Sequence, residues 1–211
     1  MKNLKIEPKK FSDKIFTMKG ITKKTVENHL KLYQGYVNKY NEIVEKLNKL
    51  TDDDYTKGNQ VYSTIRELKI ELSFSWGGII NHEIYFDHLG GKGGKPSGKL
   101  IEQIKKDFSS FENYVRDVRA TAMSARGWVW TGWNHIEGRL FNYLGDAQNS
   151  YLVWGVTPLL ALDTYEHAYF ADFGTDRASY LDVFFENLDW KKIQENFENT
   201  ACCGDDECTC Q

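Results

Sequence analysis

Cysteine is missing from most of this chain, because all four cysteines lie close to its end: Cys202, Cys203, Cys208 and Cys210. The preceding residues therefore offer no thiol for a disulfide bond or for a thiolate metal site. Any metal ion bound in the core must use nitrogen and oxygen ligands instead.

A broad basic surface and long apolar runs are lacking as well. The formal net charge is −3, which argues against nucleic acid or an anionic membrane as a partner. No segment approaches the roughly 20 apolar residues that a membrane span needs. Residues 1–10 are too polar for a secretory signal, so we expect a cytoplasmic protein.

Aromatic side chains are abundant, at 14% of the sequence, which favours a dense core around a small site. From residue 24 to about residue 50, apolar residues recur every three or four positions, which predicts a long amphipathic helix with Thr22 as its N-cap. The polar residues 51–54 break this pattern and offer a cap for the next helix. A second helix is predicted over residues 61–89, and the pair forms an antiparallel hairpin.

The glycine-rich segment 90–98 ends the hairpin and marks a domain boundary. The pattern beyond it predicts helices at 100–108 and 111–125, strands at 128–133, 139–144 and 159–162 with a turn at 134–138, and a helix at 180–188. The predicted fold class is therefore α+β. It comprises an N-terminal α-hairpin domain (1–90), then a domain of helices around a small three-stranded antiparallel sheet (91–200), and a disordered cysteine-rich tail (201–211).

Two of the five histidines lie on apolar faces of the predicted hairpin. His29 follows Val26 by three residues, and His82 follows Ile79 by three. A lone histidine in such a place is more often a hydrogen-bonded core residue than a ligand. Two of them on paired helices favour a metal site, because facing helices build such sites in bundle cores.

An acid and a third histidine occur together later in the chain. Asp163 follows the apolar run 158–162, and His167 comes four residues later, so both side chains can reach one point. A buried carboxylate is costly without a partner, and a cation is a good one. A structural Asp–His hydrogen bond is an equally weighted alternative for this stretch.

Three imidazoles and a carboxylate suit a first-row metal that changes its oxidation state. A di-iron carboxylate centre is excluded, because no histidine has a glutamate three residues before it. We interpret His88 and His135 as solvated or capping residues.

Several short motifs resemble those of the iron/manganese superoxide dismutases. Residues 163–170 resemble the signature Asp-x-[Trp/Phe]-Glu-His-[Ala/Ser/Thr]-[Phe/Tyr]-[Phe/Tyr], and residues 81–86 resemble the second-ligand segment. Residues 127–130 are similar to the Gly-Trp-x-Trp strand, and residues 25–37 to the first ligand helix. The motifs occur in the family's order over residues 20–197.

The resemblance implies an enzyme that disproportionates superoxide to oxygen and hydrogen peroxide by redox cycling of one manganese or iron ion per subunit. The metal ligands that it implies are His29, His82, Asp163 and His167. It also implies a homodimer, or a homotetramer built from dimers, in which Glu166 and Tyr169 reach the facing subunit.

Further residues around the metal are implied by the same resemblance. Tyr36 matches the gateway tyrosine, and Trp128 matches a wall of the pocket. A family glutamine that bonds metal-bound solvent comes either from the position held here by Gly78 or from the loop that carries Gln148. The second arrangement is similar to manganese-type members, so we favour manganese over iron.

The sequence departs from the family pattern at three places. His29 and Tyr36 are seven residues apart where eight is usual, Tyr33 replaces a second histidine, and Tyr165 replaces Trp or Phe. All four ligands are kept, which favours an enzyme over a non-catalytic metal-binding or structural relative. A hydrolase is disfavoured because the aromatic wall suits a very small substrate.

The cysteine tail is not part of that pattern. Its four thiols are open to three interpretations: a soft-metal site, disulfides between chains, or a solvated and reduced segment. We favour the last.

Overall fold

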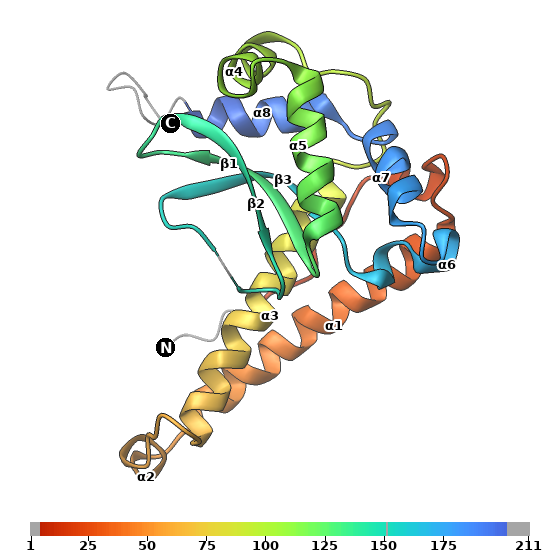
Figure 1. Cartoon of the computed structure of the whole chain (residues 1–211). Coiled ribbons are helices and arrows are strands. Elements are labelled where there is room, and N and C mark those ends of the chain that lie inside the picture. Colours follow the sequence, from red (N-terminus) through yellow and green to blue (C-terminus); the bar gives the residue numbers. More distant parts are fainter. Residues whose placement is uncertain (1–4, 151, 202–211) are drawn as a thin grey trace.

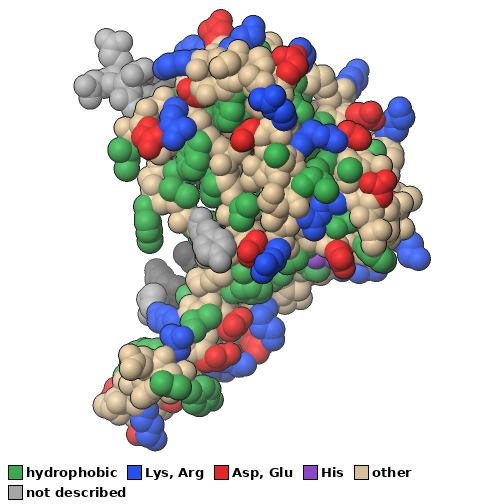
Figure 2. Space-filling view, viewed as in Figure 1, with side chains coloured by type: hydrophobic (Ala, Val, Ile, Leu, Met, Phe, Trp, Pro, Cys, Tyr) green, Lys and Arg blue, Asp and Glu red, His purple; other side chains and the backbone are tan. Residues whose placement is uncertain are grey.

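The computed structural model describes residues 5–150 and 152–201 (Figure 1). The predicted tail therefore lies, apart from Ala201, outside the described residues. Among the helices of the described ranges, none is long and apolar enough to cross a membrane. Side chains of both charge signs are mixed over the face seen in Figure 2, without a large field of one sign.

The predicted helical hairpin is confirmed. Helix α1 (Lys23–Leu47) begins at Thr22, whose side chain accepts a hydrogen bond from the Thr25 amide. Helix α3 (Thr64–Asp87) packs against α1, and the far end of the pair projects from the body of the molecule (Figure 1). One face of each helix carries the apolar residues that bury the contact.

The turn of the hairpin differs from the prediction. A short helix α2 (Asp52–Thr56) forms there, and a capping box between Thr51 and Asp54 begins it. Helix α3 starts at Thr64 rather than at residue 61, because the Ser63 hydroxyl accepts from the Arg66 amide and caps the helix. Val61 is 82% exposed and belongs to the loop.

The three-stranded antiparallel sheet is also confirmed, with the order β2-β1-β3. Its strands are β1 (Trp128–Asn134), β2 (Arg139–Gly145) and β3 (Val156–Asp163). Strand β3 starts before the predicted residue 159, because β1 pairs with it as far as Asn134 and Val156. The register shifts between Thr131 and Gly132, which lets the strand continue past Pro158.

Helices surround this sheet (Figure 1). Those after the hairpin are α4 (Gly98–Phe108), α5 (Phe111–Ser124), α6 (Phe170–Phe173), α7 (Arg177–Glu186) and α8 (Trp190–Ala201), with 3-10 helices η1 (Asp13–Thr17) and η2 (Glu166–Ala168). The helix predicted at 180–188 is confirmed as α7, which starts at Arg177 and ends at Glu186. Helix α8 is absent from the prediction, and the carbonyl of Asp189 starts it by accepting the amides of Lys192 and Ile193.

Of the two roles predicted for His88, solvated or capping, the structure confirms the second, because His88 is the C-cap residue of α3. Its side chain is fully buried, and its Nε2 accepts the amide of Ala161 on β3. Strand β3 is an edge strand, so amides on its outer side need partners from elsewhere. His88 supplies one and fixes α3 against the sheet. His135 is exposed in the β1–β2 turn, as predicted.

Candidate metal centre

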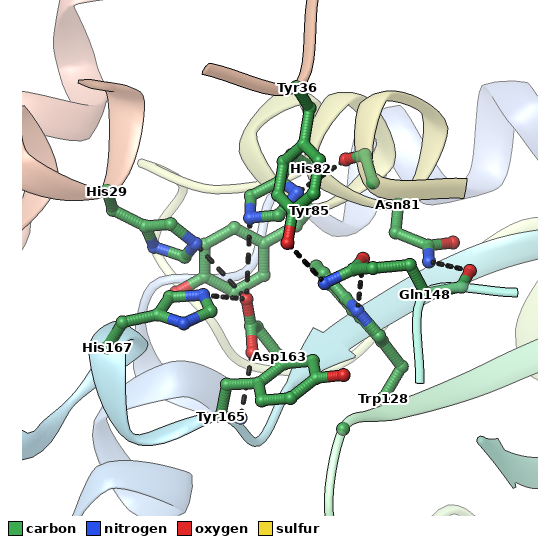
Figure 3. A network of polar contacts seen from close by, with 12 residues as sticks. His29, Tyr36, Asn81, His82, Tyr85, Trp128, Gln148, Asp163, Tyr165 and His167 are labelled. Carbon is green, nitrogen blue, oxygen red and sulfur yellow. Dashed lines mark hydrogen bonds and ion pairs between the residues drawn. The ribbon is translucent and has the colours of Figure 1, made fainter. Parts of the chain in front are cut away.

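Four residues from four elements converge inside the molecule. His29 comes from α1, His82 from α3, Asp163 from the end of β3, and His167 from η2. One nitrogen or oxygen atom of each lies within 4.8 Å of the others, and all four side chains point toward a common centre (Figure 3). The structure thus brings together the residues that the sequence predicted as ligands.

The carboxylate of Asp163 is at the middle of this cluster. Its Oδ2 lies 3.1 Å from His29 Nε2, 3.0 Å from His167 Nε2 and 3.7 Å from His82 Nε2. Its Oδ1 accepts the amide of Tyr165 at 2.9 Å, which fixes the carboxylate plane. The side chain of His167 is 28% exposed, while the other three are almost completely buried, so the site opens to solvent on the side of His167.

His82 has the geometry of a metal ligand. Its Nδ1 lies 2.5 Å from the Gly78 carbonyl oxygen, an acceptor, so this nitrogen carries the ring proton. The other nitrogen, Nε2, is buried and has no hydrogen-bond partner within the described part of the chain. A ligating histidine commonly donates its other N–H to a carbonyl, so the lone pair of Nε2 is free for a cation.

Charge in the cluster is held by Asp163 and His167. Burial alone would raise the pKa of Asp163, but the charge of His167 and hydrogen bonds from His167 and His29 hold it well below its usual value. Burial would lower the pKa of His167, and Asp163 raises it instead. Burial lowers the pKa of His29, and burial together with His29 lowers that of His82 to about 3.

At neutral pH the cluster therefore offers one carboxylate and two neutral imidazoles, with a third imidazole held beside the carboxylate. These groups are hard to intermediate donors without a thiolate, and they suit manganese, iron and zinc. The residues present fit a single bound cation. Of these metals, the two that change oxidation state would make the centre able to exchange electrons.

A hydrogen-bonded row flanks the cluster. Trp128 Nε1 donates to Gln148 Oε1 at 2.9 Å, and Gln148 Nε2 donates to the Tyr36 hydroxyl at 3.1 Å (Figure 3). The ring centroid of Tyr36 lies 5.4 Å from that of His82, and the Trp128 ring lies 5.1 Å from it. The structure therefore places the three predicted residues next to the cluster.

Two glycines of α3 make room for this row. A Cβ atom on Gly78 would lie 2.5 Å from the Tyr36 ring, and one on Gly77 would collide with the Gln148 carbonyl. Gly78 is the alternative glutamine position of the family pattern, so a side chain there and the present place of Tyr36 exclude each other.

The two tyrosine substitutions have different surroundings. The Tyr165 ring stacks on His167 at 5.3 Å, and its hydroxyl donates weakly to the Asp146 carbonyl at 3.4 Å. Burial raises the pKa of Tyr165 to about 12. The Tyr33 hydroxyl faces away from the cluster, donating to Glu83 and accepting the Lys9 amide. Tyr33 therefore ties the backbone at Lys9 to both helices of the hairpin.

The two residues predicted at a subunit interface differ in exposure. Glu166 is exposed next to His167, whereas the Tyr169 side chain is only 3% exposed. Tyr169 stacks on Tyr180 at 5.0 Å, and its hydroxyl accepts from Arg177. Phe170 beside them is 49% exposed, so this stretch presents apolar surface next to the opening of the site.

Sequence reasoning missed three residues that support the cluster. The Tyr180 hydroxyl donates to the Asp163 carbonyl at 2.9 Å and lies 3.2 Å from that of Tyr85. Asn81 donates to the Gln148 carbonyl and accepts from Trp130. Asn81 directly precedes His82 in the motif at residues 81–86, so the sequence could have identified it. Tyr180 lies far along the chain, with no spacing to mark it.

Comparison with known proteins agrees with the geometry. Residues 19–90 match the model of the iron/manganese superoxide dismutases, alpha-hairpin domain, and residues 96–196 match that of the C-terminal domain. An iron superoxide dismutase of Aquifex pyrophilus is 42% identical over 197 residues, 92% of each chain. Manganese superoxide dismutase 1 of Halobacterium salinarum is 34% identical over 172 residues, 80% of this chain and 82% of that one. This chain belongs to the iron/manganese superoxide dismutase family and is a superoxide dismutase of that type.

Proposed function

We propose that His29, His82, Asp163 and His167 are the protein ligands of one manganese or iron ion, and that superoxide is disproportionated there. The observation that supports this most is the approach of four donor atoms from four elements to within 4.8 Å of one another, with the lone pair of His82 Nε2 unused. When bound, the ion supplies the one-electron couple that turns one superoxide into oxygen and the next into peroxide.

The residues beside the ligands hold and orient protons in this proposal. Tyr36 accepts a hydrogen bond from Gln148, so its own hydroxyl hydrogen is free to donate into the pocket. Burial and the charge of Asp163 raise the pKa of Tyr36, which keeps this proton on the phenol at neutral pH. Trp128 fixes the Gln148 amide by donating to its oxygen. Peroxide formation needs two protons, and Tyr36 is the donor that we assign.

We propose that the site works with either ion. The loop position of Gln148 is similar to that of manganese-type members, which supports manganese. The relative from Aquifex pyrophilus is named as an iron enzyme, and the relative from Halobacterium salinarum as a manganese enzyme. Three imidazoles and a carboxylate accept both ions, so the supply of metal decides the occupancy.

We further propose that the enzyme is a homodimer or a homotetramer built from dimers, with Glu166 bonding to His167 of the partner subunit. Support comes from the exposure of Glu166 and Phe170 beside the open side of His167. Sedimentation of wild type and Glu166→Ala tests this proposal. We expect the subunits of the variant to associate more weakly than those of wild type. A wild type that sediments as a monomer would contradict the proposal. The predicted cytoplasmic location is likewise a proposal, which cell fractionation tests.

Reconstitution tests the metal proposal. Metal-free protein is loaded without oxygen with manganese(II) or iron(II), and bound metal and dismutation rate are measured on the same sample. We expect about one ion per chain and activity with both metals. Activity with one metal alone would contradict the proposal of dual use, and activity without either would contradict the proposed site. His167→Ala should lose both metal and activity.

A further inference from the structure

A row of three stacked aromatic rings leads from the metal centre to the surface. The Trp128 ring contacts the His82 ring, with centroids 5.1 Å apart. Trp130 stacks on Trp128 at 6.4 Å and 18°, and Tyr143 of β2 stacks on Trp130 at 5.2 Å and 27°. Successive rings are thus close to van der Waals contact along the whole row.

The outer end of this row lies at a cleft. Trp130 and Tyr143 line a cavity of about 690 Å³ whose wall also includes Trp76 and Trp154. Trp76 is 45% exposed and Trp154 is 94% exposed, so the cleft opens to solvent. The inner members, Trp128 and Trp130, are 0% and 1% exposed. Tyr143 is partly buried, so the tyrosine end of the row is the part that reaches solvent.

Both indole N–H groups donate to side-chain oxygens, and such acceptors stabilise an indole ring that has lost an electron. Trp128 Nε1 donates to the Gln148 side-chain oxygen, and Trp130 Nε1 donates to the Asn81 side-chain oxygen. Removal of an electron makes the indole N–H a stronger donor, and hydrogen bonds from charged donors are about twice as strong as neutral ones. The two amides therefore stabilise the oxidised indoles without a change in position.

We propose that Trp128, Trp130 and Tyr143 carry oxidising equivalents away from the metal centre to the cleft, where the substrate superoxide discharges them. Indole and phenol are, after thiols, the side chains most easily oxidised by one electron, and the described residues contain no thiol. The inference rests on the proposed metal site. It concerns the fate of the product peroxide, a reaction separate from dismutation.

The ion held by His29, His82, Asp163 and His167 would, in its divalent form, supply the electron that reduces peroxide to hydroxide and a hydroxyl radical. Trp128 gives one electron to the radical, which leaves as hydroxide. Trp130 then reduces Trp128, and Tyr143 reduces Trp130 while its phenol proton passes to water in the cleft. Superoxide gives an electron to the Tyr143 radical, which takes up one proton, and oxygen leaves.

Two other tyrosines also contact ligand rings. Tyr36 lies 5.4 Å from His82, and Tyr165 lies 5.3 Å from His167. A radical on either would remain within the site and damage the residues that dismutation uses. The row through Trp128 is different because it leaves the site and ends at solvent. Oxidation at Tyr36 or Tyr165 is therefore the outcome that competes with the proposal.

Tyr143→Phe tests the inference, because it keeps the stacked ring and removes the phenol. Tyr62→Phe is the matched control, since Tyr62 is a 75% exposed tyrosine at the far end of the hairpin. Wild type and both variants are loaded with iron(II), and bound iron, thermal stability and dismutation rate are recorded first. Failure of the wild type to bind iron or to dismutate superoxide at this step would contradict the proposed metal site. Hydrogen peroxide is then added, the sample is frozen for electron paramagnetic resonance, and oxidised residues are mapped by mass spectrometry.

We expect a tyrosyl radical and oxidised Tyr143 in wild type and in Tyr62→Phe. In Tyr143→Phe the tyrosyl signal should disappear and oxidation of Trp128 and Trp130 should rise severalfold, with metal content and dismutation rate unchanged. Superoxide added after peroxide should shorten the life of the wild-type radical. The proposal is overturned if Tyr143→Phe gives the wild-type signal and oxidation map, or if the radical resides on Tyr36 or Tyr165. Equal oxidation of Tyr143 in metal-free protein would overturn it as well.

Discussion

The side-chain amide of Gln148 connects two groups beside the metal centre, since it accepts from Trp128 and donates to Tyr36. Gln148→Ala removes both bonds and leaves the ligand atoms in place. Turnover should fall roughly 10–100-fold, the usual cost of losing such a partner, while about one ion per chain stays bound. Metal analysis and a dismutation assay on the same sample measure this.

The neighbouring amide provides the control. Asn149 donates to Ser73 on the outside of α3, so Asn149→Ala should keep the wild-type turnover. Equal turnover in Gln148→Ala and wild type would remove Gln148 from the mechanism that we propose.

At the residue scale, sequence identified the candidate ligands and misjudged the burial of His88. The ligands lie in motifs whose spacing reflects helix faces and a strand end, which are local properties. The burial of His88 depends on a β3 amide 73 residues further along the chain, and nothing near His88 in the sequence shows that this amide needs an acceptor.

At the scale of elements, His88 joins α3 to β3, so protonation of its side chain should change the free energy of unfolding. Burial lowers the pKa of His88 to about 4, from 6.5. The unfolded chain therefore binds this proton more tightly than the folded one does. The stabilisation is complete above pH 6.5 and is lost as the pH falls from 6.5 to 4, by about 3 kcal/mol.

His88→Gln keeps an acceptor for the Ala161 amide and cannot be protonated. Urea unfolding of metal-free wild type and variant between pH 4 and pH 8 measures the difference in unfolding free energy. As the pH falls, we expect the variant to gain about 3 kcal/mol in unfolding free energy relative to wild type. A constant difference over this range would show that His88 does not titrate as its burial requires.

Close contact between α1 and α3 gives a second prediction at the scale of elements. Gly78→Ala places a methyl group against the Tyr36 ring, which must move. Turnover should fall at least tenfold, because small misplacements of a reacting group are costly. The unfolding free energy should fall by about 1–3 kcal/mol through overpacking.

Gly35→Ala is the matched change on α1, where a Cβ atom meets nothing within 4 Å. It should raise the unfolding free energy by about 0.5–1 kcal/mol through helix propensity, with turnover unchanged. If Gly78→Ala were as stable and as active as Gly35→Ala, the contact between Gly78 and Tyr36 would have no role in placing the phenol.

Sequence periodicity predicted the long helices and the strands, because each repeats an apolar face over many residues. It missed α2 and α8 for different reasons. Helix α2 has only five residues and no buried face, so it has no apolar period. Helix α8 follows α7 after only residues 187–189, and this short break depends on capping by Asp189 rather than on glycine or proline.

At the scale of the whole molecule, the ligands come from both halves of the chain, so the metal site forms only when hairpin and sheet are joined. The division into domains at residues 90 and 91 stays a prediction. Removal of residues 202–211 deletes every cysteine and leaves all four candidate ligands in the chain. A chain ending at Ala201 should keep the metal content and turnover of wild type, and a large loss of either would give the cysteine tail a role in the enzyme.

The central claim is that one ion is shared by His29, His82, Asp163 and His167. Crystals of the manganese- or iron-loaded protein, measured at the absorption edge of that metal, test it most directly. We predict one anomalous peak per chain, within bonding distance of Nε2 of each histidine and of an Asp163 carboxylate oxygen. A peak that lies elsewhere, or that misses any of the four side chains, would contradict the account.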